Sequence, residues 1–250
     1  LAITGTNNAG YSNPSITADV RPKFCMMEGD SISSSGFGAL WPAAVQTAIG
    51  TDWLFQTTAR EYSQIDDGSA SPTASVSVRL GTTVTPFRDG SRTQEALIIW
   101  AGTNDIYGGD SAATTYAALA SVVAAAQAAN IANIAVVTML PRDGSAAVGG
   151  QSAMETRRQD YNTLIKAGYG STGTDTSVDV LDIGSDATIG GASDWSNATY
   201  YPDGTHPQTS ASTTIISGTY ISPWIVGLPA SQDAPTGLHA SVLTRRISFL

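Results

Sequence analysis

Short apolar runs alternate with longer helical segments from about residue 23 to residue 227, and this alternation limits the possible folds more than any other feature. The clearest run, Ala96 to Trp100, contains no polar residue. Such a run is typical of a central strand in a parallel sheet, because helices cover both faces of that sheet. The alternation therefore predicts a three-layer α/β/α sandwich, in which ligands bind beyond the carboxyl ends of the strands.

The expected elements follow from hydrophobic period, proline and glycine positions, and length. Val76, Val78 and Leu80 alternate with polar residues and predict a half-buried strand, which forms a small hairpin with a second segment. The expected strands are Lys23 to Met27, Trp53 to Thr57, Ala74 to Leu80 with its partner Thr83 to Phe87, Ala96 to Trp100, Ile134 to Leu140 and Val178 to Ile183. The expected helices are Leu40 to Ile49, Ala112 to Ala129, Ala153 to Ala167 and Thr213 to Ile225.

Both ends of the chain differ from its centre in composition. Residues 1–22 are rich in Asn, Thr, Ser, Gly and Pro and predict an N-terminal arm or linker. Residues 23–228, which contain the alternating segments, form one predicted domain. Residues 229–250 are predicted to form a linker and tail, in which 234–242 resembles the opening strand of a fibronectin type III module. The alternative is that the tail adds a strand to the core or to a partner chain. These flanks suggest part of a larger multidomain protein that is extracellular, on a cell surface or virion-associated.

Composition argues against several classes of partner. The chain has 12 Lys and Arg against 21 Asp and Glu, a formal net charge of -9, which disfavours nucleic acid and anionic membranes. No stretch reaches the ~18 apolar residues of a membrane span. The single cysteine, Cys25, excludes a disulfide framework and leaves too few ligands for a Cys/His metal cage. Residues 168–173 match a dinucleotide-binding fingerprint, but they follow a helical segment and predict helix termination. We therefore expect no metal and no cofactor.

The serine of Gly29-Asp30-Ser31 directly follows the apolar run Phe24 to Met27, and a helix-like pattern follows it. A serine at such a strand-to-helix turn lies at the carboxyl edge of the sheet, where backbone N–H groups point outward and can hold an anion. We interpret Ser31 as a nucleophile, with Asp30 bracing the turn.

A base for this serine must come from two histidines, His206 and His239. His206 follows Asp203 by three residues, and in a turn this spacing can place the carboxylate against the imidazole, which fixes its tautomer. A capping aspartate beside a surface histidine is an equally good interpretation of the spacing alone. His239 has no acidic neighbour and is predicted to be a surface residue.

A third polar group, Asn104, lies in Gly102-Thr103-Asn104-Asp105 directly after the best central strand. An asparagine there can aim its side-chain N–H at the anion of a tetrahedral intermediate. The alternative is an ordinary Gly-Asn turn. Asp105 fits helix capping or loop bracing better than catalysis.

In this order, the three motifs resemble three of the four sequence blocks of the SGNH (GDSL-like) hydrolases, over about residues 23 to 227. The resemblance implies a flavodoxin-like fold with a five-stranded parallel sheet. It also implies that Ser31 attacks an ester, that His206 is the base and that Asp203 orients it. The oxyanion hole would combine the backbone N–H of Ser31, a glycine N–H and the Asn104 side chain.

The glycine block is where this sequence departs from the family. The loop after Trp53 to Thr57 holds no glycine before Gly68. We assign the glycine donor to Gly68. The alternative is a backbone N–H near Arg60, since an N–H needs no particular side chain.

Aromatic residues flank the motifs and suggest a carbohydrate substrate, because aromatic faces can stack on sugar rings. The candidates for substrate binding are Trp41, Trp195, Tyr200 and Tyr201, for which core packing is the alternative. The expected reaction is removal of acetyl or other short acyl groups from an acylated glycan. Two alternatives remain, a general short-chain esterase or thioesterase acting on a small ester, and a non-catalytic glycan-binding or structural module of a surface or phage tail protein.

Overall fold

A computed structural model of the chain describes residues 23–34, 39–66, 75–84 and 94–229. Within these ranges five strands form one sheet in the order β2-β1-β3-β4-β5, and every pair of neighbours is parallel. Their bounds are Lys23–Gly29 for β1, Trp53–Thr57 for β2, Gln94–Trp100 for β3, Asn133–Val137 for β4 and Val178–Leu181 for β5. This is the flavodoxin-like strand order, so the predicted fold class is confirmed.

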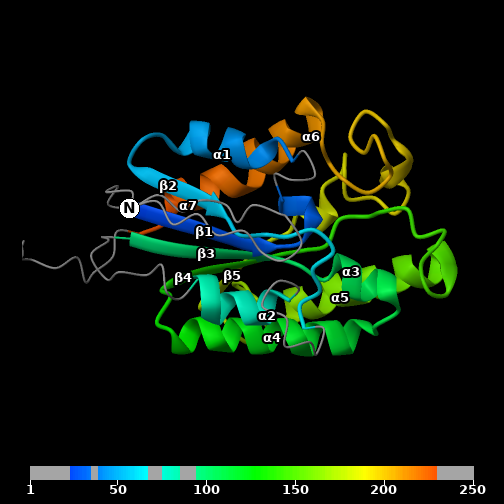
Figure 1. Cartoon of the computed structure of the whole chain (residues 1–250), viewed down its shortest axis with the longest axis horizontal. Coiled ribbons are helices and arrows are strands. Elements are labelled where there is room, and N and C mark those ends of the chain that lie inside the picture. The colour runs from blue at the N-terminus through cyan, green and yellow to red at the C-terminus, as the bar shows by residue number, and fades with distance from the viewer. Residues whose placement is uncertain (1–22, 35–38, 67–74, 85–93, 230–250) are drawn as a thin grey trace, which may run out of the picture.

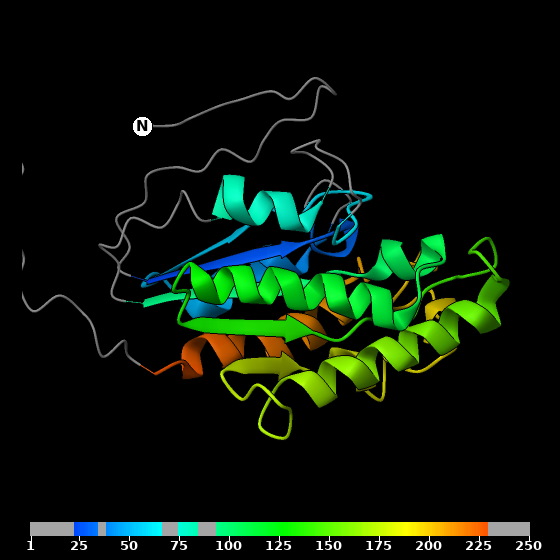
Figure 2. The same ribbon diagram turned by 90° about the horizontal axis from the view of Figure 1, so that it is seen from below.

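Helices cover both faces of the sheet (Figure 1). One face carries α1 (Trp41–Ile49), α6 (Ser210–Ile215), a π-helical segment (Ile216–Ile221) and α7 (Ser222–Gly227). The other face carries α2 (Val76–Arg79), α3 (Thr103–Gly108), α4 (Ala112–Ala128) and α5 (Gly150–Gly168) (Figure 2). None of the helices in the described part of the chain combines the length and apolar character that a membrane span requires.

The apolar run of β3 shows why this sheet has two hydrophobic faces. Ile98 and Trp100 pack in the cluster beneath α1, whereas Leu97 and Ile99 pack in the cluster beneath α4 and α5. Successive side chains of a strand point to opposite faces, so a strand between two helical layers is apolar at every position. The inference of a buried central strand is therefore confirmed.

The register of β1 against β3 places the two strand ends side by side. Gly29 of β1 pairs with Trp100, the last residue of β3. A Cβ at Gly29 would lie 2.3 Å from the Trp100 carbonyl oxygen, so only glycine fits here. The segments that follow, with Ser31 after β1 and Asn104 after β3, therefore start from adjacent points on the carboxyl edge.

The predicted strand Ala74 to Leu80 is wrong, because Val76–Arg79 is an α-helical turn capped by Ser75. It continues as a π-helical segment over Leu80–Val84, so the described part of the predicted hairpin is helical. Residues 85–87 of the predicted partner strand lie outside the described residues. Val76 and Leu80 are buried and Val78 is half-buried. Apolar residues at i, i+2 and i+4 fit a strand, but the i and i+4 pair also fits one helical face, and the structure buries that pair.

Most other boundaries differ from the predicted ones by a few residues at the ends. The expected helix Thr213 to Ile225 falls within one helical run, 210–227. Residues 168–173 follow the end of α5 at Gly168, as predicted. The predicted N-terminal arm, nearly all of the predicted tail and His239 lie outside the described residues.

We predict that Gly29→Ala destabilises the protein by about 1–3 kcal/mol, because the new methyl group overlaps a carbonyl in a packed region. Gly218→Ala is the control, since a Cβ at this helical position would have no atom of the described residues within 4 Å. Alanine is the better helix former, so this variant should keep or gain stability. Urea denaturation of both variants measures the difference, and equal stabilities would contradict the close approach of the two strands.

Candidate active site

Three segments that meet at the carboxyl edge of the sheet supply the polar residues of the site. Ser31 opens a 3₁₀ turn, Ser31–Ser33, directly after β1. Asn104 lies in the first turn of α3, directly after β3. His206 lies in the loop that precedes α6. Crossover connections in a parallel sheet bring these distant parts of the chain to one edge.

Ser31, His206 and Asp203 form a continuous chain of hydrogen bonds. The Ser31 Oγ lies 2.9 Å from His206 Nε2, and His206 Nδ1 lies 2.6 Å from Asp203 Oδ2. Since a carboxylate only accepts, Nδ1 carries the proton and Nε2 presents its lone pair to the serine hydroxyl. Both Ser31 and His206 are buried, at 6% and 8% exposure. The arrangement can move the serine proton to the imidazole.

The turn that holds this pair is local. Asp203 Oδ1 accepts hydrogen bonds from the backbone N–H groups of Thr205, at 2.9 Å, and His206, at 2.7 Å. Gly204 between them has φ +74°, a left-handed conformation that favours glycine. Partial burial would raise the pKa of Asp203, but the hydrogen bonds from His206 and Thr205 outweigh it and hold the pKa below its ordinary value.

The Asn104 amide is held at both ends. Its Nδ2 donates to the backbone carbonyl of Ser63 at 2.9 Å, and its Oδ1 accepts from Arg142 Nη1 at 3.3 Å. A primary amide has two N–H donors, so the bond to Ser63 leaves a second donor on Asn104. An anion at the carboxyl edge can accept from it.

Two buried carboxylates brace the segments that carry the site. Asp30 accepts from the backbone N–H of Ile32 at 3.0 Å and from that of Thr103, so it joins the Ser31 turn to the start of α3. Asp105 accepts from the backbone N–H of Ile65 at 3.0 and 3.2 Å and holds the loop after β2. Burial raises the pKa of Asp30 to about 6 and that of Asp105 to about 7. Both residues are bracing groups, as the sequence suggested.

A buried ion pair that was not predicted from the sequence lies beneath the site. Arg79 Nε lies 3.0 Å from Glu28 Oε2, and both side chains have 0% exposure. The same guanidinium donates to the carbonyl of Gly29 and to Ser63 Oγ, each at 2.8 Å. Glu28 also accepts from the hydroxyl of Thr58. The sequence contains two signals for this ion pair. One is a glutamate at the end of the apolar run before Gly29, and the other is the arginine between Val78 and Leu80.

The aromatic residues proposed for substrate binding separate into two groups. Trp41 and Tyr201 have 0% and 1% exposure, because Trp41 packs on Trp100 and Phe55 and the Tyr201 hydroxyl bonds the carbonyl of Ile189. They cannot offer a face to a sugar, so this prediction is wrong for both.

The other two aromatic candidates are only partly buried. Trp195 lies beside the turn that carries His206, since its Cε3 would be 3.6 Å from a Cβ at Gly204. Tyr200 packs partly against the core. Trp195 is therefore the candidate that the structure shows beside the turn of His206.

The glycine donor of the oxyanion hole stays a prediction, because Gly68 lies outside the described residues. The alternative near Arg60 is restricted by the fold. The Arg60 N–H donates to the Gly29 carbonyl at 3.2 Å, and the N–H groups of Thr58 and Ala59 are also bonded within the chain. Among the described residues no cluster of three or more His, Cys, Asp or Glu could hold a metal ion.

The chain is similar to a known protein family in sequence and to known proteins in fold. The family model described as the GDSL-like Lipase/Acylhydrolase family matches residues 28–211. No curated protein sequence matches the chain. A lipolytic G-D-S-L family protein from Veillonella parvula has a similar structure, with a TM-score of 0.59, 14% identity, and 78% of this chain and 94% of that chain covered.

Two further solved structures have similar folds at equally low identity. A carbohydrate esterase family 3 protein from Talaromyces cellulolyticus has a TM-score of 0.56 at 16% identity, covering 81% of this chain and 96% of its own. The aryl esterase of M. smegmatis has a TM-score of 0.55 at 14% identity, covering 79% and 95%. At such identities the likeness shows the fold alone.

The raised pKa of Asp105 predicts a pH-dependent stability. Between the ordinary carboxyl pKa of about 3.9 and the native value of about 7, the native state holds more protons than the unfolded state. The free energy of unfolding therefore falls as pH rises through this window. Asp105→Asn lacks this proton, so its stability relative to the wild type should increase from about pH 4 to about pH 7. Urea denaturation across the window measures it, with the exposed Asp52→Asn as control, and parallel curves for Asp105→Asn and wild type would contradict the burial of this charge.

Proposed function

We propose that this chain, which belongs to the GDSL-like lipase/acylhydrolase family, hydrolyses esters through an acyl-enzyme formed on Ser31. The observation that carries this proposal is the continuous hydrogen-bond chain from Ser31 Oγ through His206 to Asp203. A nucleophile, a base and an orienting carboxylate within hydrogen-bond reach are the requirements of nucleophilic acyl transfer.

In the proposed reaction, Ser31 Oγ attacks the ester carbonyl carbon while His206 Nε2 takes the hydroxyl proton. The tetrahedral intermediate collapses when the ester C–O bond breaks, and His206 gives the proton to the departing alcohol. Water then attacks the acyl-enzyme with the same base, and the carboxylic acid leaves as Ser31 regains its proton. Asp203 keeps the imidazole in the required tautomer and stabilises the imidazolium that forms in each step.

The negative oxygen of the intermediate needs donors that are already in place. We assign the backbone N–H of Ser31 and the second N–H of Asn104 to this role, with Gly68 as the proposed third donor. Ser63 and Arg142 fix the Asn104 amide before substrate arrives, so this donor needs no reorganisation during the reaction. Loss of one such donor typically lowers the rate by about 10²–10³-fold.

For the substrate, we propose an acetyl or short acyl ester on a carbohydrate. The half-buried Trp195 beside Gly204 supports this, because an aromatic face next to the reacting groups can stack on a sugar ring. The similar fold of the Talaromyces cellulolyticus carbohydrate esterase is consistent with it. A second candidate is a general short-chain esterase, for which the similar fold of the M. smegmatis aryl esterase is the supporting observation. The hydrogen-bonded Ser31, His206 and Asp203 argue against a non-catalytic module.

We predict that Ser31→Ala lowers kcat/KM on p-nitrophenyl acetate by at least about 10³-fold, because the nucleophile is lost. Ser33→Ala is the control in the same 3₁₀ turn, since the buried Ser33 hydroxyl has no hydrogen-bond partner among the residues that the structure describes. A fluorophosphonate should label the wild type and Ser33→Ala on the peptide that contains Ser31, as mapped by mass spectrometry. Full turnover by Ser31→Ala, or an adduct on another residue, would assign the reaction to a different site.

A second prediction separates the two candidate substrates. Trp195→Ala should raise KM for acetylated xylan at least about fivefold, since a stacking aromatic contributes about 1 kcal/mol or more, and leave KM for p-nitrophenyl acetate nearly unchanged. Trp224→Ala is the control, because that half-buried tryptophan of α7 donates its indole N–H to Asp179 of β5. Acetate release measures the first substrate. No acetate from acetylated glycans, together with turnover of small esters, would favour the general esterase.

A further inference from the structure

Arg142 reaches the oxyanion side of the site from the segment that follows β4. Its Nη1 donates to Asn104 Oδ1 at 3.3 Å, and its guanidinium carbon lies 4.1 Å from the centroid of the Tyr107 ring. Among the described residues, its buried Nε has no hydrogen-bond partner. Within that part of the chain, the bond to Asn104 is the hydrogen bond of this guanidinium, and Arg142 was not among the residues singled out from the sequence.

The two neighbours of the Asn104 amide specify which way it points. The two ends of a carboxamide have nearly the same shape, so a rotation of 180° exchanges donor and acceptor at little steric cost. The Ser63 carbonyl can only accept and faces Nδ2, whereas the Arg142 guanidinium can only donate and faces Oδ1. In the reversed amide, Oδ1 would face the Ser63 carbonyl oxygen and Nδ2 would face the Arg142 guanidinium. Acceptor would then meet acceptor, and donor would meet donor. Arg142 therefore helps to select the orientation in which Nδ2 carries a second N–H at the site.

A positive charge on the oxygen end also changes the donor strength of the amide. Hydrogen bonds in a chain polarise one another, and a charged donor on Oδ1 makes the Nδ2–H groups better donors. This effect grows when the accepting oxygen gains negative charge. It is therefore larger for a tetrahedral intermediate than for a neutral ester carbonyl.

We propose that Arg142 is a positioning residue for ester hydrolysis, which holds the Asn104 amide in its donating orientation and strengthens that donor in the transition state. The inference rests on the proposed function, because it assigns Asn104 to the oxyanion.

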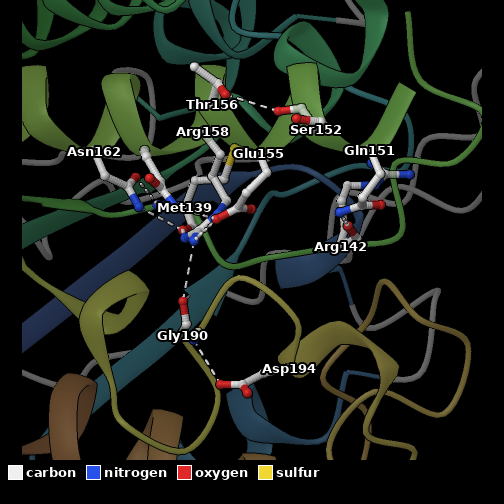
Figure 3. A network of polar contacts seen from close by, with 12 residues as sticks. Met139, Arg142, Gln151, Ser152, Glu155, Thr156, Arg158, Asn162, Gly190 and Asp194 are labelled. Atoms are coloured by element: carbon white, nitrogen blue, oxygen red, sulfur yellow. Dashed lines mark hydrogen bonds and ion pairs between the residues drawn. The ribbon is translucent and has the colours of Figure 1, made fainter. Parts of the chain in front are cut away.

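Side chains of α5 bond the backbone of the segment that carries Arg142 (Figure 3). Gln151 Nε2 donates to the Arg142 carbonyl at 3.2 Å. Three residues earlier, the Met139 peptide is held from both sides, because its N–H donates to Asn162 Oδ1 at 2.7 Å and its carbonyl accepts from Arg158 Nη1 at 2.9 Å. A residue that acts through another needs such support, since misplacement by about 1 Å weakens a preorganised site.

The charges around Arg142 favour this role over recognition of an anionic substrate. Burial lowers the pKa of Arg142, and attraction to the carboxylates of Asp30 and Asp203 offsets this only in part. These two acids already attract the guanidinium, and a substrate carboxylate beside it would be repelled by both of them. If Arg142 instead recognised an anionic substrate, its replacement would raise KM for anionic esters alone.

A double-mutant cycle with Asn104 tests the proposal on p-nitrophenyl acetate. Arg142→Met should lower kcat by about 10–100-fold with little change in KM, because its effect cannot exceed that of losing the Asn104 donor itself. In the Asn104→Ala background the same change should cost less than about twofold, because the residue it acts through is gone. Arg142→Lys can still donate to Oδ1 and should recover part of the lost rate. Affinity for an alkylboronic acid, which forms a tetrahedral adduct with the serine, should fall in parallel with kcat.

The control for this cycle is Arg157→Met. Arg157 also lies on the same side of the sheet and bonds backbone carbonyls, those of Ile106 at 3.0 Å and Val148 at 2.7 Å. Its effect should be additive with that of Asn104→Ala. Three results would overturn the proposal. They are additive effects of Arg142→Met and Asn104→Ala, an unchanged kcat for Arg142→Met, and a rise in KM confined to anionic esters. Failure of the proposed function has a different signature, namely no ester turnover by the wild type or full turnover by Ser31→Ala.

Discussion

The buried ion pair between Glu28 and Arg79 is the interaction on which the arrangement of the site depends. Removing two charges from water is costly, and the cost is offset only if both ions find good partners. Here the guanidinium bonds Glu28, the Gly29 carbonyl and Ser63 Oγ, so it joins the end of β1 to the loop after β2. The carbonyl of the same Ser63 holds Asn104. One charged group thus positions the backbone on both sides of the proposed oxyanion hole.

Three aspartates near the site differ in their environments, and this difference separates their roles. Asp30 and Asp105 are buried and accept hydrogen bonds from backbone N–H groups, and their pKa values are raised. Asp203 lies in a more exposed turn, where His206 and Thr205 lower its pKa. A carboxylate that stays ionised suits the stabilisation of an imidazolium, whereas buried carboxyls suit a structural role. The environments agree with the proposed division between bracing and orienting groups.

Apolar patterns in this sequence indicate the local structure correctly only where the number of buried faces is fixed. The apolar run of β3 identified a strand correctly, because two helical layers leave no polar position on a central strand. The strand predicted from Val76, Val78 and Leu80 is wrong, because part of their spacing also fits a helix. Of these three residues, the structure buries only those at i and i+4. Trp41 and Tyr201 misled for a related reason, since closeness in sequence to a motif does not determine whether a ring faces the site or the core.

The sequence by itself determined most of the strand–helix alternation, the spacing that allows Asp203 to meet His206 in a turn, and the positions of Ser31 and Asn104 after their strands. These are properties of short segments, where a few residues fix the local backbone. Only the tertiary structure decided that Glu28 pairs with Arg79 and that Arg142 holds Asn104, since these partners are 51 and 38 residues apart. A charged group needs a partner when it is buried. Its burial is decided when the chain packs and cannot be inferred from the residue type alone.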